Sequence, residues 1–254
     1  MAVTAKVPII ETAVQAWRDA AIARERMPTL FWIAIAVLFG LNILQSLLGG
    51  WGAASFVGGV IFALAQALAL TPVAIAVHRF ILLDEARDRY DFAPGDPRFQ
   101  KFFLFTIALE ALGAIPRIVA FLLAIVAPLL APLVLLALAI GAAIIGVRTA
   151  ILFPSIAIDA PGADWRHAMA DAKGHSWRIF LVLLCVVLPA AVIEIVLIAL
   201  LSWIGLLGAI ALGLIVPAVT IAVVAAGAAA ASRLYAVYAN QLGRPMNFYM
   251  RAAA

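Results

Sequence analysis

Four ionisable side chains lie inside long apolar stretches of this chain, namely Glu110, Arg117, Arg148 and Glu194. An ionised group in hydrocarbon costs a few kcal/mol or more, so such residues pair with one another or line a polar pathway. As pairs they would fix the register of neighbouring helices. As members of a pathway they would serve a proton, an ion or an anionic substrate.

The depths of these four residues predict two ion pairs. A rise of about 1.5 Å per residue puts Arg117 and Glu194 about 22 and 24 Å from the charge-rich edge of their stretches. Glu110, at about 12 Å, lies within roughly one helical turn of the depth of Arg148. We therefore expect Arg117 to pair with Glu194, and Glu110 to pair with Arg148.

The elements that must position these charges are six apolar segments. The 254 residues are 67% hydrophobic and 12% charged, which is more apolar surface than a water-soluble fold can bury. Long unbroken apolar runs favour membrane-spanning helices, and hence an all-α, polytopic helix bundle. Within a membrane domain of residues 29–234, the predicted spans are 29–48, 53–80, 102–126, 131–155, 178–199 and 205–234.

Two shorter amphipathic helices are predicted outside the spans. Residues 1–28 form a cytoplasmic segment whose helix, 7–26, carries an apolar stripe of Ile10, Val14, Trp17 and Ala21. The second helix, 164–173, has Asp164 as its N-cap. Both are expected to lie in the plane of the lipid headgroups. Residues 235–254 form a short cytoplasmic tail.

The distribution of Lys and Arg predicts the orientation. The connections after the first, third and fifth spans, 49–52, 127–132 and 201–204, carry no charge, whereas nearly all Lys and Arg lie in the other connections and the tails. Cationic loops remain in the cytoplasm, so both termini are predicted to be cytoplasmic.

Basic residues near the cytoplasmic ends of the spans form a second candidate site. The predicted ring consists of Arg79, Lys173, Arg178 and Arg233. These cations would bind the phosphates of membrane lipids, or would serve only as ordinary anchors of the helices.

Small residues spaced four apart predict close helix packing. They are Gly205, Ala209 and Gly213, followed by Ala225 and Ala229. Such a face brings helices together within one chain, in a homo-oligomer or against a membrane-protein partner.

Motifs for catalysis and for metal or cofactor binding are missing from the sequence. It contains no HExxH, GxSxG, P-loop or CxxC pattern, and its single cysteine, Cys185, lies in a span. We expect no catalytic residue, metal or cofactor. The basic residues are interleaved with Asp and Glu, so no nucleic-acid partner is expected either.

Residues 148–159, with the sequence RTAILFPSIAID, are followed by Gly162, Ala168 and the pair Lys173-Gly174. This stretch, with the region from Pro72 to Glu85, resembles bacterial six-helix inner-membrane proteins. They are described as like the membrane domain of glycerophosphoryl diester phosphodiesterases, or as the YciC-type uncharacterised family. The resemblance implies a multi-pass protein of the bacterial inner (plasma) membrane. It implies no activity, because catalysis in the phosphodiesterases belongs to a separate soluble domain.

A weaker likeness concerns the segment from Ala168 through Gly174 to Leu188-Pro189. It resembles the loop by which permeases of ABC transporters contact their ATPase, although the leading acid of that signature is missing.

These observations support two main functional hypotheses. The first is a non-enzymatic scaffold or accessory subunit that binds lipid or a membrane-protein partner. The second is a transporter or permease component that uses Glu110, Arg117, Arg148 and Glu194. An enzyme is a third hypothesis, and it would require a cavity that holds a histidine together with a carboxylate.

Overall fold

The computed structural model of the protein describes residues 7–48 and 54–242, and every regular element in those ranges is helical. Six helical stretches of this described part are long and apolar enough to cross a membrane. They confirm the predicted all-α class and indicate a multi-pass membrane protein. In chain order the elements are α1 (Ile9–Arg26), α2 (Pro28–Leu48), α3 (Ala54–Leu83), α4 (Pro97–Val126), α5 (Ala131–Thr149), α6 (Leu152–Ala157), α7 (Trp165–Asp171), α8 (Ser176–Leu201), η1 (Ser202–Ile204) and α9 (Leu206–Tyr238).

Aspartate caps determine where α4 and α7 begin. The Asp96 carboxylate accepts a hydrogen bond from the backbone N–H of Arg98, and Pro97 occupies the first helical position. Helix α4 therefore begins before residue 102, the predicted start of this span. Asp164 accepts from the backbone N–H of Arg166 in the same way and caps α7, which confirms the predicted N-cap.

The fourth predicted span, 131–155, is two helices rather than one. Helix α5 ends at Thr149, and α6 follows after a short turn. Pro154 lacks the N–H that would bond four residues back, and its ring would clash with the carbonyl of Ala150 in a continuous helix. In α6 it falls in the first turn, where no intrahelical donor is required.

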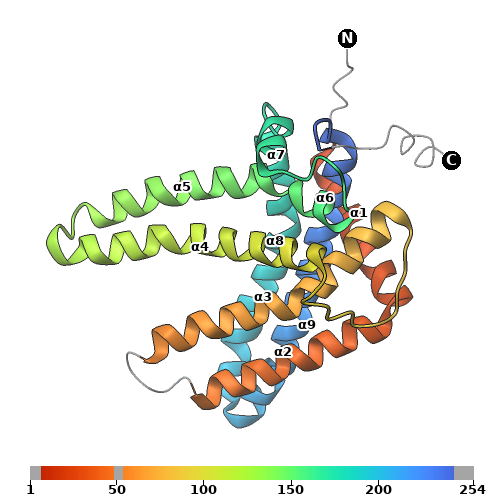
Figure 1. Ribbon diagram of the computed structural model, residues 1–254. Helices are drawn as coiled ribbons and strands as arrows, with labels where there is room; N and C mark the ends of the chain where they lie inside the picture. The colour runs from red at the N-terminus through yellow and green to blue at the C-terminus, as the bar shows by residue number, and fades with distance from the viewer. Residues whose placement is uncertain (1–6, 49–53, 243–254) are drawn as a thin grey trace.

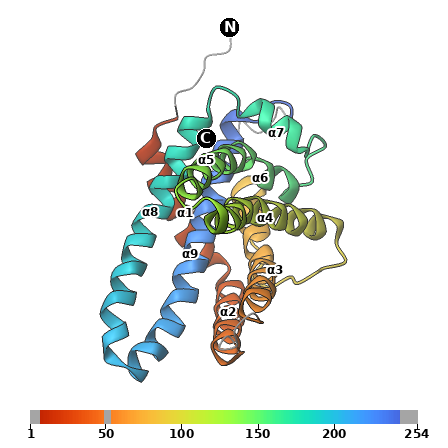
Figure 2. The same ribbon diagram turned by 90° about the vertical axis from the view of Figure 1, so that its left-hand side faces the viewer.

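Within the described residues, three helical hairpins build the fold: α2 with α3, α4 with α5, and α8 with α9. They meet at a common base and diverge toward their tips (Figures 1 and 2). In Figure 1 the α4–α5 hairpin extends to the left, whereas the α8–α9 hairpin extends downward. The outer halves of the hairpins consequently leave much apolar surface exposed, and of the 30 residues of α4 only Phe99, Phe102, Pro116 and Ala120 are buried.

The packed core lies at the base of the hairpins. Helix α9 passes through it and contacts α1, α2, α3, α6 and α8. Its small side chains allow this close approach, since Ala225 and Ala229 are fully buried. Residues near the base, such as Val77 of α3 and Val182 of α8, complete the core.

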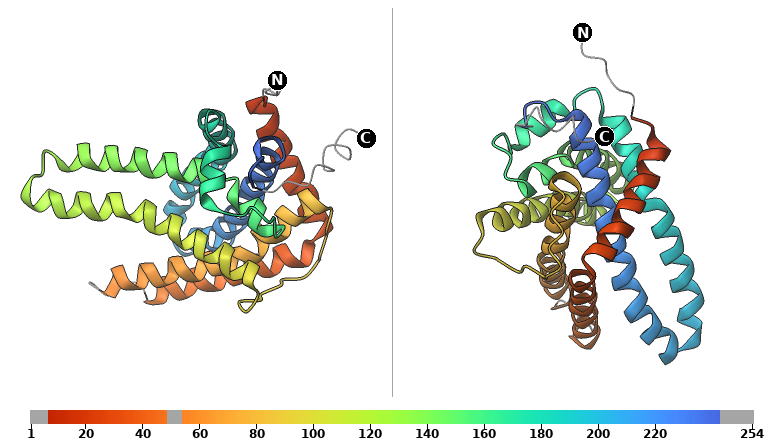
Figure 3. Two further views of the ribbon diagram at one scale, coloured as in Figure 1. Left: turned by 45° about the horizontal axis from the view of Figure 1, so that its top comes forward. Right: turned by 90° about the vertical axis from the view of Figure 1, so that its right-hand side faces the viewer.

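Helix α1 packs alongside α8 and α9 (Figure 3). It presents an alanine face to them, and this face includes Ala16 and Ala23, which are fully buried. The predicted apolar stripe points elsewhere, because Ile10 and Val14 are exposed. Trp17 of the stripe nevertheless packs against the core, and its indole N–H donates to the carbonyl of Val186 at 3.2 Å. Only part of the stripe is therefore exposed, while the alanine face holds α1 to the protein.

Candidate functional site

A cavity of about 470 Å³ lies where the three hairpins meet. On α4, the lining residues Phe102, Thr106 and Glu110 recur every four positions, which puts them on one helical face. Residues three or four apart line it in the same way along α3, up to His78, and along α9 around Gly227. One face of each of three helices, α3, α4 and α9, therefore lines this largely apolar site.

Most polar groups of the lining already have partners. The hydroxyls of Thr71 and Thr106 donate to carbonyls one turn back in their own helices, at 2.8 and 3.0 Å. The amide of Gln66 donates to the side-chain oxygen of Asn42 in α2 at 3.1 Å. These groups are satisfied without a ligand.

His78 is the one histidine of the cavity lining among the described residues. Its Nδ1 lies 2.8 Å from the hydroxyl oxygen of Ser232, and both side chains are buried. Ser232 itself does not line the cavity, and no hydrogen bond joins His78 to Glu110. The His–carboxylate combination of the third hypothesis is thus present in one cavity, but without an exposed nucleophile beside the histidine.

Glu110 differs from its neighbours because its carboxylate forms no hydrogen bond or ion pair with any described residue. The predicted pair with Arg148 does not form. The Nε of Arg148 instead donates to the hydroxyl of Ser176 at the start of α8, at 3.0 Å. Similar depth was insufficient to predict contact, because a side chain on α8 lies within reach of Arg148 and Glu110 faces the cavity.

The predicted pair of Arg117 and Glu194 is also not formed, because no ion pair within 4 Å joins these described residues. Arg117 lies on α4 and Glu194 lies on α8. These helices belong to two hairpins that extend in different directions from the base (Figures 1 and 2). Equal distance from the base does not bring side chains together when the hairpins diverge.

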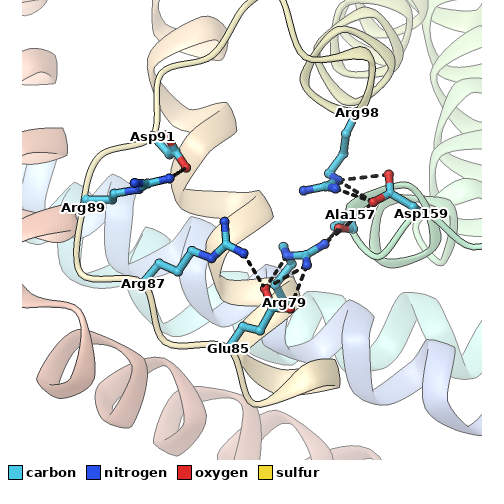
Figure 4. Close-up of polar contacts among 8 residues, drawn as sticks. All are labelled: Arg79, Glu85, Arg87, Arg89, Asp91, Arg98, Ala157 and Asp159. Atoms are coloured by element: carbon cyan, nitrogen blue, oxygen red, sulfur yellow. Dashed lines mark hydrogen bonds and ion pairs between the residues drawn. The ribbon is translucent and has the colours of Figure 1, made fainter.

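A network of charged residues lies beside the base of α3 (Figure 4). The guanidinium of Arg79 donates two hydrogen bonds of 2.9 Å to the carboxylate of Glu85 and one of 2.9 Å to the carbonyl of Ala157. Arg98, from the first turn of α4, binds the carboxylate of Asp159 through its Nε and Nη2. The network ties α3, α4 and the segment after α6 together.

Arg79 was predicted from the sequence as a site residue, but Glu85, Arg98 and Asp159 were not predicted as its neighbours. The sequence did contain a signal for this network. Charged residues of opposite sign lie close to the end of α3, the start of α4 and the end of α6. The side chain of Arg79 is only 15% exposed. Its charge is therefore largely committed to carboxylates of the same chain, instead of facing lipid phosphates.

The acidic connection between α3 and α4 folds back onto the helices. The carboxylate of Asp88 accepts hydrogen bonds from the backbone N–H of Thr29 at 2.6 Å and from its hydroxyl at 2.8 Å, so it caps the start of α2. The hydroxyl of Tyr90 donates to the carbonyl of Ala69 at 2.7 Å. Burial raises the pKa of this phenol above its usual value of 10.0.

The four residues of the predicted basic ring divide into two classes. Arg79 is paired as described, and Arg233 donates to the carboxylate of Asp19 in α1, with Nη2 and Oδ1 2.9 Å apart. Lys173 and Arg178 have no carboxylate partner among the described residues. Only these two members retain an uncompensated charge.

The predicted small-residue face is partly a packing face. A Cβ added to Gly213 would lie 3.3 Å from the ring of Phe39, so α9 approaches α2 closely there. Gly205 is instead a turn residue before α9, with φ +65°, a conformation that favours glycine. The side chain of Ala209 is outside the described part of the structure.

No group of three or more His, Cys, Asp or Glu side chains that could hold a metal ion occurs within residues 7–48 and 54–242. Comparison with known proteins adds no assignment: no family model, no curated protein and no solved structure matches this chain.

Proposed function

We propose that this protein is a non-enzymatic scaffold or accessory subunit that binds a lipid-like molecule in the cavity between α3, α4 and α9. The observation that carries the proposal is the cavity itself. At about 470 Å³ it falls within the range of about 300–1,000 Å³ typical of small-molecule sites. Its lining is mainly aliphatic and aromatic, with few polar groups, as in sites that bind apolar molecules.

The proposed function places the protein in a membrane with a defined orientation. The charge-free turns at the hairpin tips and the charges at the base favour an orientation with both termini and the two short helices α1 and α7 on the cytoplasmic side. The likeness to the six-helix phosphodiesterase membrane-domain and YciC-type proteins implies the bacterial inner (plasma) membrane. Lys173 and Arg178 would contact lipid phosphates, and the exposed hairpin faces would contact lipid, a protein partner or a second copy.

Substitution of Gly227 tests whether the cavity binds a ligand. Gly227 lines the cavity, and a Cβ added there meets no atom within 4 Å, so the side chain of Gly227→Leu can start without a clash and would occupy part of the cavity. Gly141→Leu is the matched control, because its Cβ also meets nothing within 4 Å and it does not line the cavity.

Native mass spectrometry of the protein extracted from membranes provides the readout. We expect a bound small molecule on the wild-type protein and on Gly141→Leu, and its loss from Gly227→Leu. Equal retention by all three proteins would show that the cavity is not the binding site.

A transporter or permease component is the second candidate function, favoured by the unpaired carboxylate of Glu110 in the cavity. Intramembrane acids of this kind mark substrate or ion pathways. The two functions predict different rates of substrate movement across a membrane. Liposomes that contain a transporter would lose a trapped substrate at a rate that depends on Glu110, whereas liposomes that contain a scaffold would bind the molecule without releasing contents.

A further inference from the structure

We infer that the ligand of the cavity is an amphipathic cation, with an apolar body and an ammonium or phosphonium head that lies against Glu110. This inference rests on the proposed function, because it names the chemical class of the molecule that the cavity binds. It follows from the charge and from the surface of the lining.

The charge of the lining is negative and uncompensated. Glu110 is the only Asp, Glu, Lys or Arg that lines the cavity in the described part of the chain. Its predicted partner, Arg148, is bonded to Ser176, and Arg117 does not line the cavity. Glu110 is an exposed residue at the cavity, and it lies in a helix apolar enough to cross a membrane, where a carboxylate attracts a cation more strongly than in water because the surrounding dielectric constant is lower.

The lining also excludes other charge types. A phosphate or carboxylate group on the ligand would require a Lys or Arg, and none lines the cavity among the described residues. The apolar surface suits hydrocarbon or aromatic groups. The partly exposed ring of Phe153, whose centroid lies 4.8 Å from that of the buried Phe102, adds an aromatic surface that can attract a cation.

Two natural sources share this chemistry: a free lipophilic cation and the ethanolamine head of a phospholipid. In both, a positive nitrogen is attached to a large apolar body. The second source also carries a phosphate, which would have to lie outside the cavity. The experiment below separates the two sources.

The probe is tetraphenylphosphonium, titrated into the full-length purified protein in detergent by calorimetry. We expect Glu110→Gln to bind it about tenfold more weakly, a loss that corresponds to about 1.4 kcal/mol. Glu110→Asp keeps the charge and should retain most of the affinity. Glu194→Gln removes an identical charge from α8, outside the cavity, and should bind like the wild-type protein.

The outcomes separate the inference from the proposed function. Equal affinity of the wild-type protein and Glu110→Gln would overturn the inference. If Gly227→Leu still abolished binding, the cavity would remain a ligand site; if it also bound normally, the proposed function would fail as well. A phosphatidylethanolamine molecule that co-purifies and is displaced by the probe would support the lipid source, and binding by lipid-free protein would support the free cation.

Discussion

At the level of single residues, Arg79 and Glu110 represent opposite solutions to the cost of a charge in an apolar helix. Arg79 has a carboxylate and a backbone carbonyl as acceptors, and its side chain is 15% exposed. Glu110 has no partner among the described residues, and it lines a cavity. The first arrangement stabilises a junction between helices, whereas the second leaves a charge available for a ligand.

Replacement of Arg79 should destabilise the protein. Arg79→Ala leaves the carbonyl of Ala157 without its donor and the carboxylate of Glu85 with only the guanidinium of Arg87, 3.6 Å away, which costs roughly 1–3 kcal/mol. Arg89→Ala is the control, because its pair with Asp91 is 66% and 54% exposed and contributes less than about 1 kcal/mol. Thermal unfolding in detergent, followed by tryptophan fluorescence, measures both. Equal shifts in Tm would show that the network does not stabilise the base.

The candidate site was only partly predictable from its residues. An acid deep in an apolar stretch identified Glu110, because the cost of a buried charge can be read from sequence. Its predicted partner, Arg148, was wrong, because depth fixes one coordinate of a side chain and not its direction. The spacing of Phe102, Thr106 and Glu110, four residues apart, was a further signal in the sequence that these side chains share one helical face. The contribution of His78 depends on how α3 packs, which no local pattern encodes.

At the level of elements, helix boundaries followed local chemistry closely. The predicted span 29–48 corresponds to α2, Pro28–Leu48, because a proline precedes an unbroken apolar run. Where prediction failed, a residue with known backbone preferences was overlooked. Asp96 and Pro97 extend α4 toward its N-terminus, and Pro154 separates α6 from α5. Such signals are local, so they could have been found from the sequence.

The turn between α8 and α9 provides a prediction for an element. A Cβ added to Gly208 would lie 1.8 Å from the carbonyl oxygen of Leu201, a backbone atom that cannot move without shifting the end of α8. Gly208→Ala should therefore destabilise the protein by about 1–3 kcal/mol, as overpacking does. Gly141→Ala, where a Cβ meets nothing within 4 Å, should be neutral or slightly stabilising because alanine favours helix. Thermal unfolding of both variants and of the wild-type protein measures these changes in stability. A Gly208→Ala variant with the wild-type Tm would contradict the close contact.

At the level of the whole molecule, the number of hairpins was predictable but their directions were not. Each apolar helix satisfies its own backbone hydrogen bonds, so composition reveals six segments whatever the angles between them. The angle between hairpins depends on packing at the base, where α9 contacts helices from the whole chain. Pairs that assume parallel hairpins, such as Arg117 with Glu194, therefore fail even when their depths agree.

The separation of charged base from uncharged tips predicts the orientation in the membrane. Leu129 and Trp203 lie at hairpin tips and are 87% and 90% exposed, whereas Arg87 and Lys173 are exposed residues of the charged connections. With Cys185 replaced by serine, we expect Leu129→Cys and Trp203→Cys to react with an impermeant maleimide added outside intact cells, because uncharged turns are translocated. Arg87→Cys and Lys173→Cys should react only after lysis. The reverse pattern would invert the orientation, and labelling of all four from one side would show that the hairpins do not cross the membrane.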